Sequence, residues 1–555
     1  MEYTRPVLAA LALVTSSVLL TACGGDDPPA APAPTPPAAP SPQPPVTGSP
    51  GPSDTGPVFP AAVTGNATAG RDVFLFETFG NERFWTDAVK LPQGIVAAGL
   101  TPVQALKLGL VVDVDRLSAT VQAAVAAELM ADPTGATSPL LNNPATTVAL
   151  INANAIPGFV VKDTNADGVL DVASGDKVGA TCALCHTRTD GSVLKVANGG
   201  SIGKRVDGPG NHNLDFGSIV AAAQNSRALY PLLQLTLAAN NNVTLGRATT
   251  GLTENSTEAE VDAYLRDKNA YPVGMFDDSF DGNGDPMHNA ALFQQDLAAP
   301  YGTEGTFTKQ DDFANVVYTG LLDPTMLTTA GGRAFLNKLG GAAGDEIAND
   351  YVAVLAATGV TGYPYVQAAT TPAPTPADAG TLAYPLGVRV NEQKLRDLNA
   401  YLFALPSPSG VPSNRAEAGA VVFRNALCTG CHNVDQTKAV PTFLIAMKTI
   451  LPSDAPVTLA QRTPPLNPVL NTVSTVFDDK WAVVNASIRG DIRGVAMPLL
   501  LDLASKPVLL HDNSVASLEA LLDPARGAQA PHPFYVTSTT DRADVAAYLR
   551  AAEAK

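Results

Sequence analysis

The sequence predicts a mainly α protein built from two similar helical units with large, loop-rich insertions. Apolar residues recur mostly every three or four positions, which is the spacing of a helix that buries one face. Residues 69–74 and 418–423 share the pattern Ala-Gly-x-x-Val-Phe, so each is expected to open a unit, and apolar-faced helices at 392–405 and 545–549 are expected to close them. With 45% hydrophobic and 16% charged residues in a chain of 555, both units can bury a core.

Two C-x-x-C-H motifs carry the chemistry: Cys182-Ala-Leu-Cys185-His186 and Cys428-Thr-Gly-Cys431-His432. At this spacing two thiols can bond the two vinyl groups of one haem while the adjacent imidazole reaches its iron. A zinc half-site or a dithiol redox pair is the alternative for an isolated C-x-x-C, but neither needs a histidine directly after both pairs. The motifs therefore predict two covalently bound haem c groups, with His186 and His432 as the proximal iron ligands.

The two motifs divide the chain into a first haem unit, residues 58–410, and a second, residues 411–555. In the second unit the motif begins five residues after the opening helix, whereas in the first it is delayed until Cys182. We therefore expect an insertion at about 77–177 before the first motif. A second insertion is expected at about 270–390 after it.

The insertions and the segments beside them contain several expected elements. Helices are predicted at 115–132, from apolar residues every four positions, and at 219–237 and 258–268. The aromatic run at 79–85 is expected to be core. As an alternative, Trp85 could lie beside a haem, where its ring could assist electron transfer.

The N-terminus predicts export and lipid anchoring. Residues 1–22 combine Arg5 with a 14-residue apolar run, which is short for a membrane span and suits a signal peptide. The small residues before Cys23 resemble a bacterial lipobox, which implies lipidation of Cys23, and residues 23–57 are expected to form a Pro/Ala-rich tether. Because bacteria attach haem c outside the cytoplasm, we expect the cell envelope, with the protein facing the periplasm or at the outer membrane, and membrane contact through lipid alone.

The charge of the chain restricts its partners. A formal net charge of -17 and a pI near 4.7 argue against nucleic acid, whose phosphates need a basic face. Small redox proteins, such as a cytochrome or a cupredoxin, are the expected electron donors or acceptors.

A possible calcium loop precedes the first motif. Asp163, Asn165, Asp167 and Asp171 place oxygens at positions 1, 3, 5 and 9, with the backbone carbonyl of Val169 at position 7 and glycine at position 6. Position 12 is Ser174 in place of glutamate, so a solvated acidic turn is the alternative. Residues 281–285 also alternate oxygen-bearing side chains, but Pro286 falls where that register requires glycine.

The second unit resembles the bacterial di-haem cytochrome c peroxidase superfamily. Residues 489–498 and 509–518, with His511-Asp-Asn-Ser-Val, are similar to the region of the family that follows the second haem motif. The superfamily includes the enzyme that matures methylamine dehydrogenase and the di-haem rubber oxygenases. Since Asn513 replaces a glycine and two leucines replace an aromatic pair, this chain is identified as a divergent member. The resemblance implies that one haem relays electrons to another, where peroxide or oxygen reacts.

The distal iron ligands stay open at the sequence level. For the second haem, the family's ligand lies shortly before the closing helix, where His532 stands, with His511 and then Met497 as alternatives. For the first haem, the candidates are His212, an open iron, or one of three later residues: Met275, Met287 and His288. No catalytic residue is assigned.

Three functions follow from these expectations. The first is a redox enzyme that reduces peroxide with electrons passed between its haems. The second is an electron carrier in which both irons are six-coordinate. The third, oxidative cleavage of an organic substrate as in the rubber oxygenases, is allowed by the large insertions.

Overall fold

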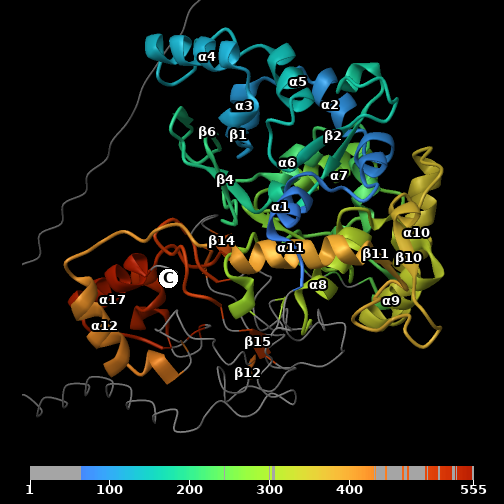
Figure 1. Cartoon of the computed structure of the whole chain (residues 1–555). Coiled ribbons are helices and arrows are strands. Elements are labelled where there is room, and N and C mark those ends of the chain that lie inside the picture. Colours follow the sequence, from blue (N-terminus) through green and yellow to red (C-terminus); the bar gives the residue numbers. More distant parts are fainter. Residues whose placement is uncertain are drawn as a thin grey trace, which may run out of the picture. The chain divides into compact units, whose positions relative to one another are not determined.

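The computed structural model describes residues 64–552, except 243, 245, 299–300, 303–306, 431, 433–443, 447–465, 468–471, 474–493, 497, 511–512, 528–529, 531 and 533. All described residues belong to one unit, Gly48–Lys555 (Figure 1). The predicted signal peptide, Cys23 and the tether lie outside the described residues, as do Cys431, His511 and Met497. The backbone alone is described at 444–446, 466–467, 472–473 and 494–496.

Helices make up 44% of the structure and strands 10%, which confirms a mainly α chain. None of the described helices is long and apolar enough to cross a membrane. The α-helices are α1 (Ala67–Phe76), α2 (Leu91–Ala97), α3 (Pro102–Lys107), α4 (Ala119–Ala131), α5 (Pro144–Asn152), α6 (Phe216–Val220), α7 (Glu258–Arg266), α8 (Gln310–Val316), α9 (Ala330–Gly340), α10 (Ala342–Ala357), α11 (Glu392–Ala404), α12 (Ala416–Asn425), α16 (Leu518–Leu521) and α17 (Thr539–Ala551).

The same helix pair occurs twice. Helix α1 packs on α11, and α12 packs on α17 (Figure 1). In both pairs a glycine lies at the crossing: a Cβ added at Gly70 would lie 1.8 Å from the Asp397 carbonyl oxygen, and one added at Gly419 would lie 1.9 Å from the Asp544 carbonyl oxygen. The two crossings are therefore built alike, as the shared Ala-Gly-x-x-Val-Phe pattern predicts.

An aromatic pair completes each crossing. The rings of Phe74 and Tyr401 have centres 5.6 Å apart and planes at 53°. The corresponding rings of Phe423 and Tyr548 are also 5.6 Å apart, with planes at 59°. In each pair the phenylalanine lies four residues after the glycine at the crossing. The tyrosine lies four residues after the aspartate whose carbonyl faces that glycine. The agreement in residue type and geometry supports an internal repeat.

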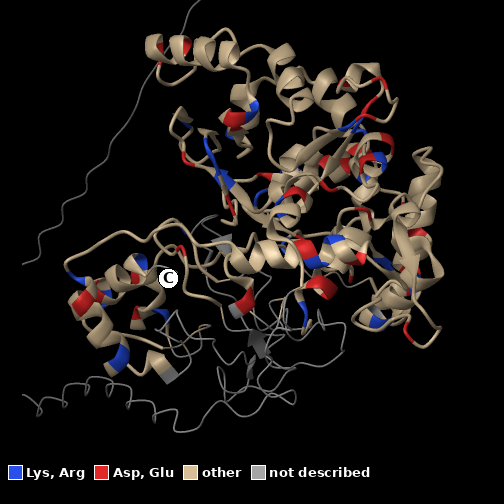
Figure 2. Cartoon of the chain, in the orientation of Figure 1, with Lys and Arg blue, Asp and Glu red and all other residues tan. Residues whose placement is uncertain are grey.

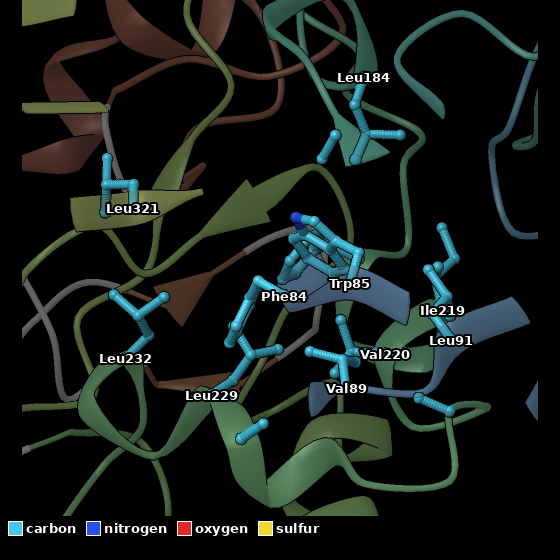
Figure 3. Packing of buried hydrophobic residues seen from close by; sticks show 14 of the residues in the cluster. Phe84, Trp85, Val89, Leu91, Leu184, Ile219, Val220, Leu229, Leu232 and Leu321 are labelled. Carbon is cyan, nitrogen blue, oxygen red and sulfur yellow. The ribbon is translucent and has the colours of Figure 1, made fainter. Parts of the chain in front are cut away.

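The large hydrophobic core lies outside these helix pairs. It contains Trp85, which is 2% exposed and packs edge-to-face on Phe84 (Figure 3). Trp85 also packs edge-to-face on Phe216. Leu184 and Cys185 of the first motif also belong to this core. The aromatic run at 79–85 is thus core, as predicted, and the insertion supports one side of the first motif.

The strands form short ladders between helices. The three-stranded sheet has the order β1-β6-β5, and the other ladders have two strands each. The strands are β1 (Val112–Asp113), β2 (Phe159–Lys162), β3 (Lys177–Ala180), β4 (Thr187–Thr189), β5 (Leu194–Lys195), β6 (Ser201–Gly203), β7 (Arg205–Asp207), β8 (Met275–Phe276), β9 (Met287–His288), β10 (Thr370–Pro372), β11 (Val388–Val390), β12 (Leu444–Ala446), β13 (Leu466–Asn467), β14 (Thr472–Val473) and β15 (Gly494–Ala496). Antiparallel pairs β2–β3, β4–β7 and β8–β9 surround the first motif in sequence.

Two predicted helices differ from the structure. The stretch 219–237 is not one helix, because α6 ends at Val220 and a 3-10 helix, Ser226–Leu232, follows with Pro231 inside it. Proline lacks an N–H and clashes with the preceding turn, so an α-helix cannot continue there. The helix predicted at 115–132 begins later, since the Ser118 hydroxyl caps α4 by accepting a bond from the N–H of Val121. Helices α7 and α11 lie where they were predicted.

Acidic and basic residues are interspersed over the described elements. Figure 2 shows both signs mixed along α11, whereas α4 carries a single charged residue, Glu128.

Candidate haem-binding sites

Both C-x-x-C-H motifs begin with the same tight turn. Residues Cys182–Leu184 and Cys428–Gly430 are 3-10 helices. The N–H of His186 donates to the Cys182 carbonyl at 3.2 Å, and the N–H of His432 donates to the Cys428 carbonyl at 2.9 Å. The backbone thus folds each histidine back toward the first cysteine of its motif. Cys431 lies outside the described residues.

The two cysteines of the first motif are half-buried, and their thiols are neutral. Burial raises the pKa of the Cys182 thiol, and it raises the pKa of Cys185 to about 12. The thiolate is the reactive form of cysteine, so with no metal bound these thiols are protonated near pH 7. Among the described residues no three His, Cys, Asp or Glu side chains form a group that could hold a metal ion.

The imidazole of His186 is oriented by the backbone. Its Nδ1 lies 2.7 Å from the carbonyl oxygen of Ala290. Because a carbonyl only accepts, Nδ1 carries the proton and Nε2 presents its lone pair, which is the arrangement that a metal-ligating histidine requires. Burial lowers the pKa of His186 to about 4, so the ring is neutral near pH 7.

In the second unit the structure brings His432 and His532 together. Their ring centres are 6.3 Å apart, with planes at 45°. Two imidazoles that each bind one metal ion at about 2 Å, from opposite sides, have ring centres about 6 Å apart. Burial lowers the pKa of His432 to about 4 and that of His532 to about 3, so both lone pairs are available. The spacing therefore fits one iron between the two rings.

Two further features single out His532. Its Nδ1 is buried and has no hydrogen-bond partner in the described part of the chain. Its backbone has a φ of 55°, in the left-handed region that a non-glycine residue adopts at a cost. A buried, unpartnered nitrogen held in a strained backbone is a typical sign of a ligand position. The alternatives His511 and Met497 lie outside the described residues.

At the first motif the structure gathers the histidines that sequence reasoning kept as alternatives. The rings of His212 and His288 stack with centres 6.1 Å apart and planes at 29°. Met275 is fully buried and pairs with His288 across strands β8 and β9. Met287, which precedes His288 in β9, is half-buried. The N–H of Asn211, the residue before His212, donates to the Cys185 carbonyl at 2.8 Å, so these candidates lie beside the first motif.

His212 differs from His288 in its polar environment. The Nε2 atom of His288 lies 3.3 Å from the Lys506 ammonium. The Nδ1 of His212 is buried and has no hydrogen-bond partner in the described part. Burial first, then Lys506, Arg188 and His186, lower the pKa of His212 to about 3. His212 is therefore a neutral imidazole with a buried nitrogen that forms no hydrogen bond in the described part of the chain.

A segment of the second unit reaches the first site, and sequence reasoning missed it. Arg188, two residues after His186, donates to the Asp502 carboxylate and to the Ser505 hydroxyl, both at 2.8 Å. Lys506 follows directly and contacts His288. No sequence pattern marks these residues, since they belong to a loop without periodicity and meet their partners only in the folded chain.

The predicted calcium loop joins β2 to β3 and has much of the expected arrangement. The Asp163 carboxylate accepts from the N–H groups of Asp167 and Gly168 at 3.1 and 2.9 Å, and the Asp167 carboxylate accepts from Val169 at 2.8 Å. Gly168 has a φ of 83°, as the sharp turn at position 6 requires. Asn165 turns its amide toward Asp167 at 3.1 Å.

The end of the same loop departs from a calcium loop. The Asp171 carboxylate caps a 3-10 turn through the N–H of Ala173 and accepts from the Asn152 amide at 2.9 Å. Asp176 instead ties the two ends of the loop together, because its carboxylate accepts from the N–H groups of Thr164 and Asp171. Oxygens at positions 1, 3 and 5 are thus available to a cation, and Asp171 is engaged elsewhere.

Comparisons with known proteins add little. No family model matches the chain, and no curated protein matches it. Among solved structures, Kuenenia stuttgartiensis hydrazine synthase pressurised with xenon matches with a TM-score of 0.24 and 13% identity, over 50% of this chain and 74% of that chain. A TM-score this low carries no argument about fold or function.

Proposed function

We propose that the protein is an exported di-haem c-type cytochrome, a divergent relative of the di-haem peroxidases. In this proposal one haem relays electrons to the other, where peroxide or oxygen reacts. The chain would be lipid-anchored at Cys23 in the bacterial cell envelope and would exchange electrons with a small redox protein. Residues 58–410 and 411–555 would be two cytochrome c-like units, each with the repeated helix pair and one C-x-x-C-H motif.

The repeat supports two equivalent haem units. The core between α1 and α11 includes Cys182 at its edge, and the core between α12 and α17 includes Cys428 in the same way. Each helix pair would therefore pack against the cysteine that begins its own motif. A zinc site or a dithiol pair gives no reason for this repeated association.

The observation that carries the proposal is the 6.3 Å spacing of the His432 and His532 rings. It supports a second haem with two protein ligands and no room for substrate. An iron with both axial positions filled changes valence with little reorganisation, which suits an electron relay. The second haem is therefore assigned the relay, and the first is assigned the reaction with peroxide.

The residues of the chain would hold the haems as follows. Cys182 and Cys185 would bond one haem, and Cys428 and Cys431 the other. The Ala290 carbonyl would keep the His186 ring in place with Nε2 toward the iron. When bound, haem supplies an iron that cycles between valence states and binds oxygen ligands. We also propose calcium at Asp163, Asn165 and Asp167, whose loop lies between the strands that lead into the first motif.

The electron carrier is the second candidate, and His212 favours it. If the unpartnered nitrogen of His212 reaches the first iron, both haems are closed to substrate. The position of this histidine near His186 is the specific observation behind that alternative.

Low-temperature electron paramagnetic resonance of the oxidised and half-reduced holoprotein tests the proposal. A peroxidase-like enzyme gives a high-spin ferric signal, at rest or after half-reduction, and consumes peroxide with a reduced cytochrome as donor. Two low-spin signals in both states would establish the carrier instead.

Matched variants assign the signals. His532→Ala should convert one low-spin signal to high-spin and leave the other haem unchanged. His212→Ala should leave the spectrum unaltered if the first iron is open, and should create a high-spin signal if His212 binds it. A His532→Ala spectrum identical to that of the wild type would refute the ligand on which the relay assignment depends.

A further inference from the structure

The loop between β8 and β9 holds a concentration of buried negative charge. Asp277, Asp281 and Asp285 are 0%, 7% and 3% exposed, and Asp278 lies beside them. None of the ion pairs in the described part of the chain involves these carboxylates. Buried carboxylates are normally paired with a cation or bound to a metal ion.

A single hydroxyl group stands among three of these carboxylates. The Ser279 Oγ lies 3.1 Å from Asp277, 3.0 Å from Asp281 and 2.8 Å from Asp285. A hydroxyl has one proton to donate, so it satisfies one carboxylate and brings two further acceptor oxygens close without a proton between them. The proton of this hydroxyl therefore cannot satisfy all three carboxylates at once.

Two carboxylate oxygens at this place have no hydrogen-bond partner. The Oδ2 atoms of Asp277 and Asp285 are buried without a hydrogen bond in the described part. Burial raises the pKa of both carboxyls well above the usual range, and the neighbouring carboxylates raise them further. An orphaned buried oxygen on each of two carboxylates indicates that a positive species belongs beside them.

The spacing of the loop identifies which species. Counted from Asp277, oxygen-bearing side chains fall at positions 1, 3, 5, 7 and 9, and position 6 is Gly282 with a φ of 79°. This is the register of a calcium loop through position 9, whereas position 12, where such a loop carries glutamate, is His288. The register that begins at Asp281 fails at Pro286. The burial of Asp277 and the contacts of Ser279 with three carboxylates show that the loop starts four residues earlier.

The two loops of this register also fold alike at their centre. In the β8–β9 loop the N–H of Asn283 donates to the Asp281 carboxylate at 2.9 Å. In the β2–β3 loop the N–H of Val169 donates to the Asp167 carboxylate at 2.8 Å. Both bonds run from position 7 to position 5.

We propose that the loop Asp277–Asp285 binds one divalent cation, with Ca²⁺ as the ion that its oxygen ligands select. Carboxylates of Asp277, Asp281 and Asp285 and the Ser279 hydroxyl supply hard oxygen ligands, which Ca²⁺ prefers. In the described part of the chain no three His, Cys, Asp or Glu side chains are already grouped so that they could hold a metal ion. Binding therefore requires Ser279 to turn and the carboxylates to close on the ion.

The position of the loop gives the ion a structural consequence. Strands β8 and β9 flank it and pair Met275 with His288, which stacks on His212. A cation in the loop would hold this hairpin closed and so fix the side chains that face the first motif. That consequence rests on the proposed haem site, whereas cation binding itself does not.

Equilibrium dialysis of the chelator-treated holoprotein against Ca²⁺ tests the proposal directly. The double variant Asp277→Asn/Asp285→Asn should bind one Ca²⁺ fewer per chain than the wild type. The matched control Asp163→Asn/Asp167→Asn changes the other loop and should leave binding at Asp277–Asp285 intact. If the first double variant binds as much Ca²⁺ as the wild type, the proposal is wrong.

Thermal unfolding separates cation binding from a merely structural role. Without Ca²⁺ the asparagine variant should melt at or above the wild-type temperature, because it loses the repulsion between buried carboxylates. With Ca²⁺ the wild type should gain stability and the variant should not. A variant that melts lower than the wild type both with and without Ca²⁺ would show that protons and hydrogen bonds alone hold the cluster, and would overturn the proposal.

Discussion

Replacing Gly419 with alanine should destabilise the second helix pair, although alanine is the better helix former. A Cβ at this position would lie 1.9 Å from the Asp544 carbonyl oxygen and 2.7 Å from the Tyr548 Cβ, whereas ordinary contact begins at 3.4 Å. The nearest contact is about 1.5 Å too short and involves backbone, so α12 and α17 must move apart, as overpacking of a close crossing requires.

The expected cost of Gly419→Ala follows from two opposing terms. Helix propensity alone would stabilise the protein by about 1 kcal/mol. Overpacking costs about 1–3 kcal/mol, and separation of the helices also weakens the Phe423–Tyr548 contact, which contributes about 0.5–1.5 kcal/mol. We expect a net loss of about 2 kcal/mol, which corresponds to a fall of roughly 4–8 °C in Tm for a unit of this size.

Urea and thermal unfolding followed by circular dichroism at 222 nm measure this loss. The exposed neighbour provides the control: Ala418→Gly should cost about 1 kcal/mol through helix propensity alone. Gly70→Ala should repeat the result in the first pair, where the added Cβ would lie 1.8 Å from the Asp397 carbonyl oxygen. A Gly419→Ala protein as stable as the wild type, or more stable, would refute the close crossing.

Three further predictions concern attachment, docking and pH. Cys182→Ser and Cys428→Ser should each reduce covalent haem from two groups per chain to one in a pyridine haemochrome assay, while Cys23→Ser keeps both; unchanged haem content would contradict the motif assignment. The side chains of Arg188 and Asp502 are 25% and 11% exposed and lie 2.8 Å apart. A double-mutant cycle with Arg188→Met and Asp502→Asn should give a coupling free energy of about 1–2 kcal/mol. A coupling near zero would mean that this ion pair does not hold the segment around Asp502 against the first motif. Burial, and then the charge of Asp281, raise the pKa of Asp278 from 3.8 to about 7. Between these two values the folded state keeps a proton on Asp278 that the unfolded state releases. The free energy of unfolding therefore falls as the pH rises from about 4 to 7. In calcium-free buffer the Tm of Asp278→Asn should therefore equal that of the wild type near pH 4 and exceed it at pH 7, and a constant difference across this range would argue against the raised pKa.

The sequence by itself determined the features that depend on local spacing. The two C-x-x-C-H motifs, the opening and closing helices of each unit and the start of α7 all follow from residues within one or two turns of each other. The same holds for the first calcium loop up to position 7, since its hydrogen bonds join near neighbours. The failure at 219–237 is also local, because Pro231 interrupts an apolar run whose composition alone suggests a helix.

Only the tertiary structure decided which distant residues meet. His432 and His532 are separated by about a hundred residues, yet their rings come within 6.3 Å, and the carbonyl that orients His186 belongs to Ala290. The sequence offered several histidines for each haem, because a free imidazole has no periodic signature. The tertiary structure narrowed the choice for the second haem, because it brings the ring of His532 to that of His432 and leaves the buried Nδ1 of His532 without a hydrogen bond in the described part of the chain. Burial likewise moved the start of the second cation loop to Asp277, because a carboxylate reveals its need for a counter-charge only when water is excluded from it.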